Sequence, residues 1–252
     1  MQGVAHRVST SVVFDHRYPE QDSCAVCAAS PALGIDLPSV SADQRAALYF
    51  MAKRCVDITL ATVLIALLLP LMVVICLAIK LDSPGAVLLG QPRVGHRGRQ
   101  FRMYKFRSMR PDRRACSVPI GFPDRRRSLK VQRDPRITRV GRMLRKTSLD
   151  ELPQLFNIVR GEMSFVGPRP EQPELLRFYS AAHYRRHDAV PGLTGVWQIH
   201  GRCIRTDGCA PAEDLRWKLL DDLYYLEHRS LGFDARIMFL TIPVVFRGRG
   251  AA

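Results

Sequence analysis

The chain has 252 residues, and its 38 Lys and Arg side chains outnumber its 23 Asp and Glu side chains, which gives a formal net charge of +15. A hydrophobic content of 47% over this length can bury a sizeable core, which excludes a chain that is disordered throughout. The positive charge favours a nucleic acid or an anionic membrane as the partner and does not choose between them. The excess is concentrated in residues 93–146, which carry nineteen cationic side chains and three acidic ones.

Residues 1–48 show no sustained hydrophobic period and contain clusters of Pro, Ser and Ala, so we expect a variable, disordered extension. Cys24 and Cys27 form a CxxC pair within it, while the other cysteines have no metal-like spacing. Seven cysteines in a chain of this length do not indicate a disulfide framework. We therefore expect reduced thiols, with a zinc site at Cys24 and Cys27 as the less favoured alternative.

An uncharged apolar segment of 22 residues covers positions 58–79. As a helix it measures about 33 Å, close to the hydrocarbon thickness of a bilayer. Pro70 removes one helical hydrogen bond near its middle and predicts a kink. Both flanks are basic, with Lys53 and Arg54 before the segment and Lys80 after it, and basic flanks favour the cytoplasmic side. A re-entrant helix satisfies both flanks, but from the residues alone re-entry and a full span stay equally open.

Short strands and a helix are predicted after the apolar segment. Residues 86–89 and 101–106 have the composition of strands, joined by a turn rich in Gly and Arg at residues 95–99. Residues 146–161 predict a helix, whose apolar stripe at three- and four-residue spacing consists of Leu149, Leu152, Phe156 and Val159.

Two further helical segments are predicted toward the C-terminus. Residues 215–228 have the pattern of an amphipathic helix. Residues 237–246 are strongly apolar, but Pro243 interrupts them and ten residues are too few to span a bilayer. This segment therefore packs in the core or lies in the membrane interface, and the sequence leaves both alternatives open.

Adjacent carboxylates, Asp150 and Glu151, follow closely behind three cationic side chains. Ser148 and Glu151 fit a capping box, or Asp150 is itself the N-cap, and either register places both carboxylates at the positive end of a helix. That position favours their ionised forms. An ionised Asp can attack phosphorus, and its neighbour can hold a divalent ion that offsets the repulsion between the nucleophile and a phosphate. The alternative is a capped surface helix without chemistry.

Several motifs follow one another in a fixed order between residues 53 and 246, nearly everything after the extension. They are Lys53-Arg54 with Asp57, Tyr104-Lys105-Phe106-Arg107-Ser108-Met109, Thr147 through Gln154, Gly161 through Pro170, Pro191 through Gly195, Gln198, Gly201-Arg202, and Asp222 with Tyr224-Tyr225. On these motifs the chain resembles the bacterial sugar transferases, which move a sugar 1-phosphate from a nucleotide sugar onto a polyprenyl phosphate.

The resemblance implies an α+β, mainly helical fold, in which a re-entrant membrane helix-break-helix precedes a small cytoplasmic catalytic domain with interfacial amphipathic helices. On this basis residues 49–84 form the membrane helix, with Pro70 as its break, and residues 85–252 form the sugar-transferase domain. The resemblance thus favours a re-entrant helix over a full membrane span, the two alternatives that the residues alone left open. The implied location is the cytoplasmic face of the bacterial inner membrane.

The resemblance also implies roles for the carboxylate dyad. Asp150 corresponds to the nucleophile, Glu151 to the residue that supports Mg2+, and Arg145 to a phosphate-binding arginine. The implied substrates are a UDP-sugar and polyprenyl (undecaprenyl) phosphate. Transfer passes through a covalent phosphosugar on Asp150 and releases UMP, as the first membrane step of exopolysaccharide, O-antigen or related glycan synthesis.

Further candidate residues lie in the segments rich in Pro and Gly. Arg169 and Arg202 are candidates for binding substrate phosphate, and Gln198 and Pro168 for binding the nucleotide or the sugar. A set of cations near the apolar segment could bind substrate phosphate or lipid headgroups, and we assign it collectively to the membrane interface. These cations are Arg93, Arg97, Arg99, Lys105 and Arg107.

Aromatic and histidine side chains are expected to have structural roles. Trp197, Tyr224 and Tyr225 are interpreted as anchors in the core or at an interface. His183 and His187 are four residues apart, but the neighbouring arginines favour an exposed position over a metal site.

The alternative function is a membrane-anchored basic scaffold or a nucleic-acid-binding protein. Such a protein would use residues 93–146 and bind with a steep salt dependence, but it gives no reason for Asp150 and Glu151. We therefore expect the lipid membrane and no nucleic acid as partner, and allow for a homodimer. A chain that has kept the motifs and lost the activity is a closer rival.

Overall fold

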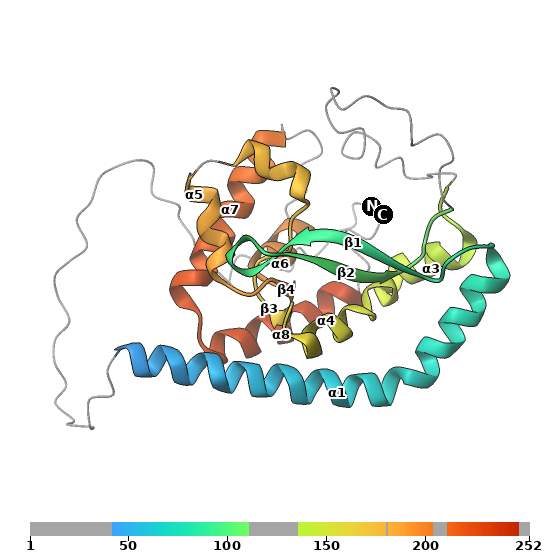
Figure 1. The fold of residues 1–252 in the computed structure, drawn as a ribbon, viewed down its shortest axis with the longest axis horizontal. Coiled ribbons are helices and arrows are strands. Elements are labelled where there is room, and N and C mark those ends of the chain that lie inside the picture. The colour runs from blue at the N-terminus through green and yellow to red at the C-terminus, as the bar shows by residue number, and fades with distance from the viewer. Residues whose placement is uncertain (1–41, 111–135, 180, 204–210, 247–252) are drawn as a thin grey trace, which may run out of the picture. The chain divides into compact units, whose positions relative to one another are not determined.

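The computed structural model describes residues 42–110, 136–179, 181–203 and 211–246. Within these residues helices predominate, and two small two-stranded sheets complete an α+β fold, as expected (Figure 1). Cys24 and Cys27 lie outside the described residues.

Helix α1 (Ala42–Asp82) contains the whole apolar segment and begins before the expected residue 49. Its length and composition would allow it to cross a membrane. Pro70 lies inside one continuous helix. The expected break into two separate helices is therefore wrong. A proline removes one helical hydrogen bond while the turns on either side remain helical, and Figure 1 shows α1 bending toward its C-terminal end.

A β-hairpin follows α1. Strands β1 (Leu88–Val94) and β2 (Gln100–Phe106) pair antiparallel. The turn predicted at residues 95–99 is confirmed and contains the short 3-10 turn η2 (His96–Gly98). Strand β1 extends farther than predicted, because Pro92 interrupts the residue pattern that is typical of a strand. A proline is tolerated here because one edge of β1 is unpaired in its two-stranded sheet.

The single helix predicted over residues 146–161 is wrong, because two helices share this part of the chain. Helix α3 (Arg139–Thr147) ends at Ser148, whose φ of 58° is left-handed. The 3-10 turn η4 (Leu149–Glu151) follows, and then α4 (Gln154–Arg160).

This break also changes which side of α4 is buried. Leu155 and Ile158 are at most 2% exposed, whereas Phe156 and Val159 of the predicted stripe are 39% and 37% exposed. A left-handed residue and a 3-10 turn rotate the chain, so a spacing counted across them does not stay on one helix face.

Strands β3 (Ser164–Val166) and β4 (Gly192–Thr194) form a short, largely buried parallel pair. The remaining elements are helical: η5 (Pro173–Phe178), α5 (Ala181–Tyr184), η6 (Arg185–Asp188), α6 (Val196–Cys203), α7 (Pro211–His228) and α8 (Leu231–Phe246).

Helix α8 extends the predicted ten-residue apolar segment to 16 residues, and Pro243 lies inside it. Ile237 is fully buried, while Phe239 is 78% exposed. Core packing, one of the two alternatives left open by the sequence, is therefore confirmed for one side of α8, and the other side presents apolar side chains outward.

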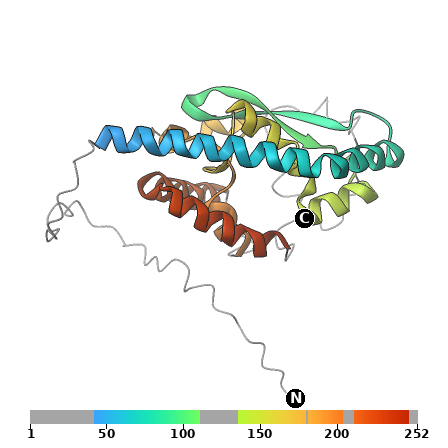
Figure 2. The same ribbon diagram turned by 90° about the horizontal axis from the view of Figure 1, so that it is seen from below.

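Buried apolar side chains of α1 pack in both core clusters of the described residues. The larger cluster joins Ala61 of α1 to Ile158 and Ile237, and the smaller one joins Ile75 of α1 to Leu144. Figure 2, which looks onto α1, shows the hairpin on one side of it and α8 on the other. Large apolar side chains remain exposed on the opposite surface of α1: Val63, Leu67, Val74, Leu77 and Leu81.

Candidate active site

Asp150 and Glu151 lie in the 3-10 turn η4, between α3 and α4. The left-handed Ser148 ends α3 through its backbone N–H, which donates to the carbonyl of Arg145, and its side chain caps neither η4 nor the dyad. The predicted capping box is therefore wrong, because Ser148 precedes η4 without a side-chain hydrogen bond to it, and Asp150 lies inside η4 instead of at an N-cap. A three-residue turn has little dipole, so the neighbouring side-chain charges decide the ionisation of the dyad.

Two cations hold Glu151. Lys105 Nζ donates to Oε1 of Glu151 at 2.9 Å, and Arg169 Nη2 donates to the same oxygen at 3.0 Å. Burial acts to raise the pKa of Glu151, but the charges of Arg169 and Lys105 overcome this effect and hold the pKa well below its ordinary value. Glu151 is therefore a fixed anion, and the predicted residues Glu151 and Arg169 are in contact.

The environment of Asp150 acts in the opposite direction. Burial and, after it, the negative charge of Glu151 raise the pKa of Asp150, against the opposing charges of Lys105 and Arg145. The expectation that both carboxylates are favoured as anions is thus confirmed for Glu151 and wrong for Asp150. A more basic carboxylate is a stronger nucleophile once it is ionised, so the two neighbours suit different roles.

Arg145 lies in the last turn of α3, and its position is set by Ser108 at the end of the hairpin. Arg145 Nε donates to Ser108 Oγ at 2.9 Å, and the carbonyl of Ser108 accepts the N–H of Thr138 at 3.2 Å. The structure therefore brings Arg145 close enough to Asp150 to act on its charge.

The backbone of Arg169 is held by Arg186, which sequence reasoning did not single out. Arg186 is 3% exposed, and its Nη2 donates to the Arg169 carbonyl at 3.1 Å. Its Nη1 donates to Glu171 Oε2 at 3.0 Å, and Asp222 Oδ2 lies 2.6 Å from its Nη2. Two carboxylates thus compensate one buried guanidinium.

The segment around Arg186 was expected to be exposed, and for His187 that expectation is wrong. His187 is 8% exposed, and its ring stacks on Tyr179, which also contacts the ring of His183. The charge run resembles a solvated surface because the carboxylates that bind Arg186 come from other parts of the chain.

Gln198 lies beside the loop that carries Arg169. A side-chain carbon added at Gly195 would come 2.9 Å from Gln198 Oε1, and it would also meet the carbonyl oxygen of Gly167. Both polar atoms of the Gln198 amide are buried without a hydrogen-bond partner among the described residues. Because buried amides are nearly always paired, Gln198 is suited to bind a polar group of a ligand.

Two other candidates contribute differently. Pro168 is buried, and its carbonyl accepts the N–H of Gly192 at 2.9 Å, so it supports the backbone of the loop. Arg202 belongs to α6, and its side chain lies outside the described residues.

The cations that were assigned together to the membrane interface have different environments. Arg107 is 4% exposed and donates to the carbonyls of Ser83 at 2.5 Å and Pro84 at 3.0 Å, so it binds the C-terminal end of α1. Lys105 holds Glu151. For these two residues the assignment is wrong. The other members are partly buried or exposed: Arg93, Arg97 and Arg99.

Asp150 and Glu151 are the carboxylates that this site offers to a divalent ion. The described residues contain no group of three or more His, Cys, Asp or Glu that could hold a metal. Mg2+ is commonly held by one or two carboxylates together with substrate phosphates, so the dyad suits a Mg2+ that is shared with a diphosphate. Lys105 and Arg169 fix the Glu151 carboxylate for such a role.

A long apolar helix joined to a carboxylate dyad with converging cations is typical of membrane-associated enzymes that act on phosphate groups. Residues 48–248 match the family model of the bacterial sugar transferases, so the chain belongs to this family. The resemblance is thereby confirmed, and the protein is a phosphoglycosyl transferase by family.

Curated relatives support the same assignment. The chain is 40% identical over 209 residues to the exopolysaccharide production protein ExoY of Rhizobium meliloti. This match covers 80% of this chain and 88% of that protein. It is 42% identical over 208 residues to the undecaprenyl-phosphate glucose phosphotransferase of Komagataeibacter xylinus, covering 80% of this chain and 37% of the relative. It is 40% identical over 201 residues to the UDP-glucose:undecaprenyl-phosphate glucose-1-phosphate transferase of Escherichia coli. This match covers 79% of this chain and 40% of the relative. The chain spans most of ExoY and less than half of the other two.

Proposed function

We propose that this enzyme transfers a sugar 1-phosphate from a UDP-sugar to undecaprenyl phosphate, as the first membrane step of exopolysaccharide or related glycan synthesis. The observation that carries the proposal is the dyad, in which Glu151 is held by Lys105 and Arg169 while Arg145 acts on the charge of Asp150. The names of the relatives, which include undecaprenyl-phosphate phosphotransferases and an exopolysaccharide production protein, support these substrate classes.

In the first step a carboxylate oxygen of Asp150 attacks the phosphorus that bears the sugar. A bond forms between this oxygen and the phosphorus, and the bond from the phosphorus to the oxygen bridging to UMP breaks, so UMP leaves with the electron pair. Arg145 and Arg169 bind diphosphate oxygens, where negative charge accumulates during transfer. The phosphosugar is then covalently attached to Asp150.

In the second step an oxygen of undecaprenyl phosphate attacks the same phosphorus. The bond from the phosphorus to Asp150 breaks, the carboxylate is regenerated, and a lipid diphosphosugar is released. Both the attacking and the leaving oxygen are anionic, so neither step requires a proton donor. The cations around the dyad instead reduce the repulsion between anions that approach one another.

Glu151 would hold a Mg2+ ion together with the substrate diphosphate. When bound, the ion supplies positive charge that reduces the repulsion between Asp150 and the phosphates. The low pKa of Glu151, which its two cationic partners enforce against burial, keeps this ligand ionised over the working pH range.

We also propose that α1 enters the membrane and returns on the cytoplasmic face. The kink that Pro70 favours inside α1 and the basic residues Lys53 and Lys80 support re-entry. A helix that crosses a bilayer could not pack along its length against a catalytic domain outside the lipid. Buried residues of α1 lie on both sides of Pro70: Asp57, Ala61, Met72, Ile75 and Ile79.

The test of this proposal replaces Asp150 by Asn in the full chain, reconstituted with undecaprenyl phosphate in phospholipid. Asp150→Asn keeps the size of the side chain and removes the nucleophilic oxygen anion, so UMP release should fall by about 1,000-fold or more. The matched control is Asp188→Asn, at an exposed carboxylate of η6, which should retain the wild-type rate. Without lipid acceptor, the wild-type protein should gain the mass of one phosphosugar and Asp150→Asn should not. Near-normal turnover by Asp150→Asn would exclude the nucleophile assignment.

A further inference from the structure

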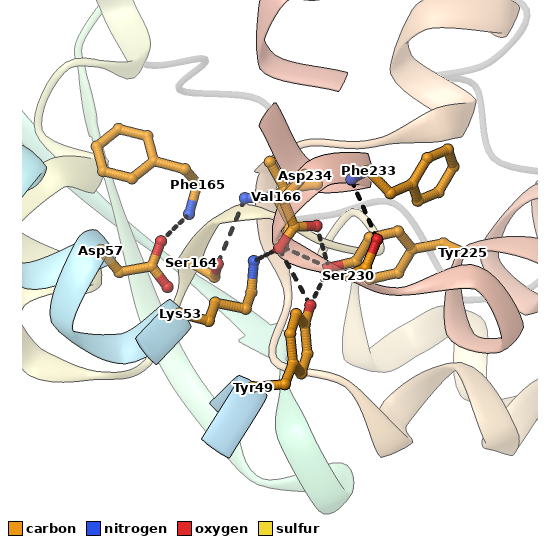
Figure 3. Close-up of polar contacts among 10 residues, drawn as sticks. All are labelled: Tyr49, Lys53, Asp57, Ser164, Phe165, Val166, Tyr225, Ser230, Phe233 and Asp234. Atoms are coloured by element: carbon orange, nitrogen blue, oxygen red, sulfur yellow. Dashed lines mark hydrogen bonds and ion pairs between the residues drawn. The ribbon is translucent and has the colours of Figure 1, made fainter. Parts of the chain in front are cut away.

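A second cluster of ionisable side chains lies where α1, α7 and α8 meet, apart from the dyad and its cations (Figure 3). Asp234 of α8 is its centre and is 4% exposed. Asp234 Oδ2 accepts hydrogen bonds from Lys53 Nζ at 2.6 Å and Tyr49 OH at 3.0 Å, and Oδ1 accepts one from Tyr225 OH at 2.9 Å. A buried carboxylate with this set of donors is well compensated, which makes the cluster a rigid junction.

Side chains of α1 and α7 connect this junction to strand β3. The hydroxyl of Tyr225 lies 3.2 Å from the carbonyl oxygen of Val166 and can donate to it. Asp57 Oδ1 accepts the N–H of Phe165 at 3.1 Å. Strand β3 has three residues and pairs with β4 in a two-stranded sheet, so these contacts add to the few backbone hydrogen bonds that hold it.

Strand β3 leads directly into the segment that carries Arg169. The N–H of Gly167 donates to the carbonyl of Thr194 at 2.9 Å, and Arg169 then reaches Glu151 at 3.0 Å. A displacement of Val166 would therefore shift Gly167 and the start of the segment whose Arg169 guanidinium lies beside the dyad. Ångström-scale misplacement of a group that contacts the substrate can reduce the rate strongly.

The single hydroxyl proton of Tyr225 is shared between Asp234 Oδ1 at 2.9 Å and the carbonyl of Val166 at 3.2 Å, with the Tyr49 hydroxyl as a more distant partner at 3.4 Å. Lys53 neutralises Asp234 from the other side, which weakens the pull of the carboxylate on this proton. Without the charge of Lys53, Asp234 would attract the proton more strongly and the bond to Val166 would weaken.

We propose that Tyr225 is a positioning residue for phosphoryl transfer, which acts through β3 on Arg169, and that Lys53 supports it by engaging Asp234. The inference rests on the proposed function, in which Arg169 binds the substrate diphosphate. It links the apolar helix to the chemistry, because Lys53 and Asp57 both belong to α1.

The test is a double-mutant cycle on the full chain in phospholipid nanodiscs, with UMP release from the UDP-sugar that the wild-type protein turns over. Tyr225→Phe keeps the ring, which stacks on Phe233, and removes the hydroxyl. It should lower kcat by about two- to tenfold in the wild-type background and by less than about twofold in the Arg169→Lys background. Tyr184→Phe, at a 50% exposed tyrosine, is the matched control and should leave kcat unchanged in both backgrounds. An equal loss in both backgrounds, or no loss in the first, overturns the proposal.

Variants of Lys53 test the same proposal independently if the Tyr225→Phe protein does not fold. Lys53→Met should reproduce the loss, and Lys53→Arg, which keeps the charge at Asp234, should restore most of the rate. A Lys53→Met protein with the wild-type rate would overturn the link to α1. If the wild-type protein itself releases no UMP, the proposed function fails. Hydrogen exchange of residues 164–169 then decides the link, since faster exchange in Lys53→Met supports it and unchanged exchange refutes it.

Discussion

Asp150 and Glu151 are neighbours in the chain, yet their pKa values shift in opposite directions. The difference arises from which cations reach each carboxylate: Lys105 and Arg169 bind Glu151 directly, whereas Asp150 is partly buried beside an anion that is already fixed. The pair thus combines a permanent anion, suited to a metal ion, with a basic carboxylate suited to attack phosphorus.

The raised pKa of Asp150 predicts a pH dependence. Only the ionised carboxylate attacks, so the rate of UMP release should fall as the pH decreases through this pKa, on a limb that lies above the ordinary Asp value of 3.8. Glu151 is already ionised in this pH range, so its titration adds no second limb to the pH–rate profile. Arg145→Gln removes a charge that lowers the Asp150 pKa, so it should move the limb to higher pH, whereas Arg145→Lys should leave it in place. A pH–rate profile of each protein in nanodiscs measures this, and a limb at or below pH 3.8 would contradict it.

Among the elements, the connection from α3 to α4 decides the geometry of the site. The left-handed Ser148 turns the chain so that Arg145 at the end of α3 and the dyad in η4 come together. Helix α3 itself is fixed by a close approach at Gly141, where an added Cβ would overlap the backbone of Ser108. Ser108 in turn binds Arg145, so packing of this helix and placement of the arginine are coupled.

Gly141→Ala tests that coupling. The methyl group must push α3 away from the backbone of Ser108, which should cost about 2 kcal/mol of stability and reduce UMP release by loosening Arg145. Gly232→Ala in α8, where an added Cβ meets nothing within 4 Å, is the control and should be neutral or slightly stabilising. Thermal unfolding in detergent gives the two Tm values, and equal Tm values for the two variants would count against the close approach.

At the scale of the whole described unit, the catalytic elements pack along α1 while the opposite surface of this helix stays apolar and exposed. Exposed apolar side chains also occur on neighbouring helices, at Phe156 of α4 and Phe239 of α8. Large apolar side chains that stay exposed on three helices favour a membrane contact and support the proposed re-entrant placement.

Re-entry predicts that tags at the N-terminus and at residue 252 are both inaccessible from outside intact cells and both accessible after permeabilisation. Pro70→Leu restores the helical hydrogen bond and straightens α1, so a fraction of molecules should expose the N-terminal tag outside. Leu69→Ala, at the neighbouring exposed position, should leave the topology unchanged. Labelling of one terminus alone in the wild-type protein would contradict re-entry.

The amino-acid sequence alone was enough to predict the apolar helix, the hairpin turn and the carboxylate dyad, because each depends on residues that are close in the chain, and the family, because its short motifs keep their order along the chain. The tertiary structure alone decided that Glu151 is bound by Lys105 and Arg169, that Arg107 and Arg186 are buried, and that the helix is broken at Ser148. These features depend on charges and packing that meet only after folding. For the same reason local spacing placed the buried stripe of α4 one position away from Leu155 and Ile158 and assigned both carboxylates to one electrostatic environment.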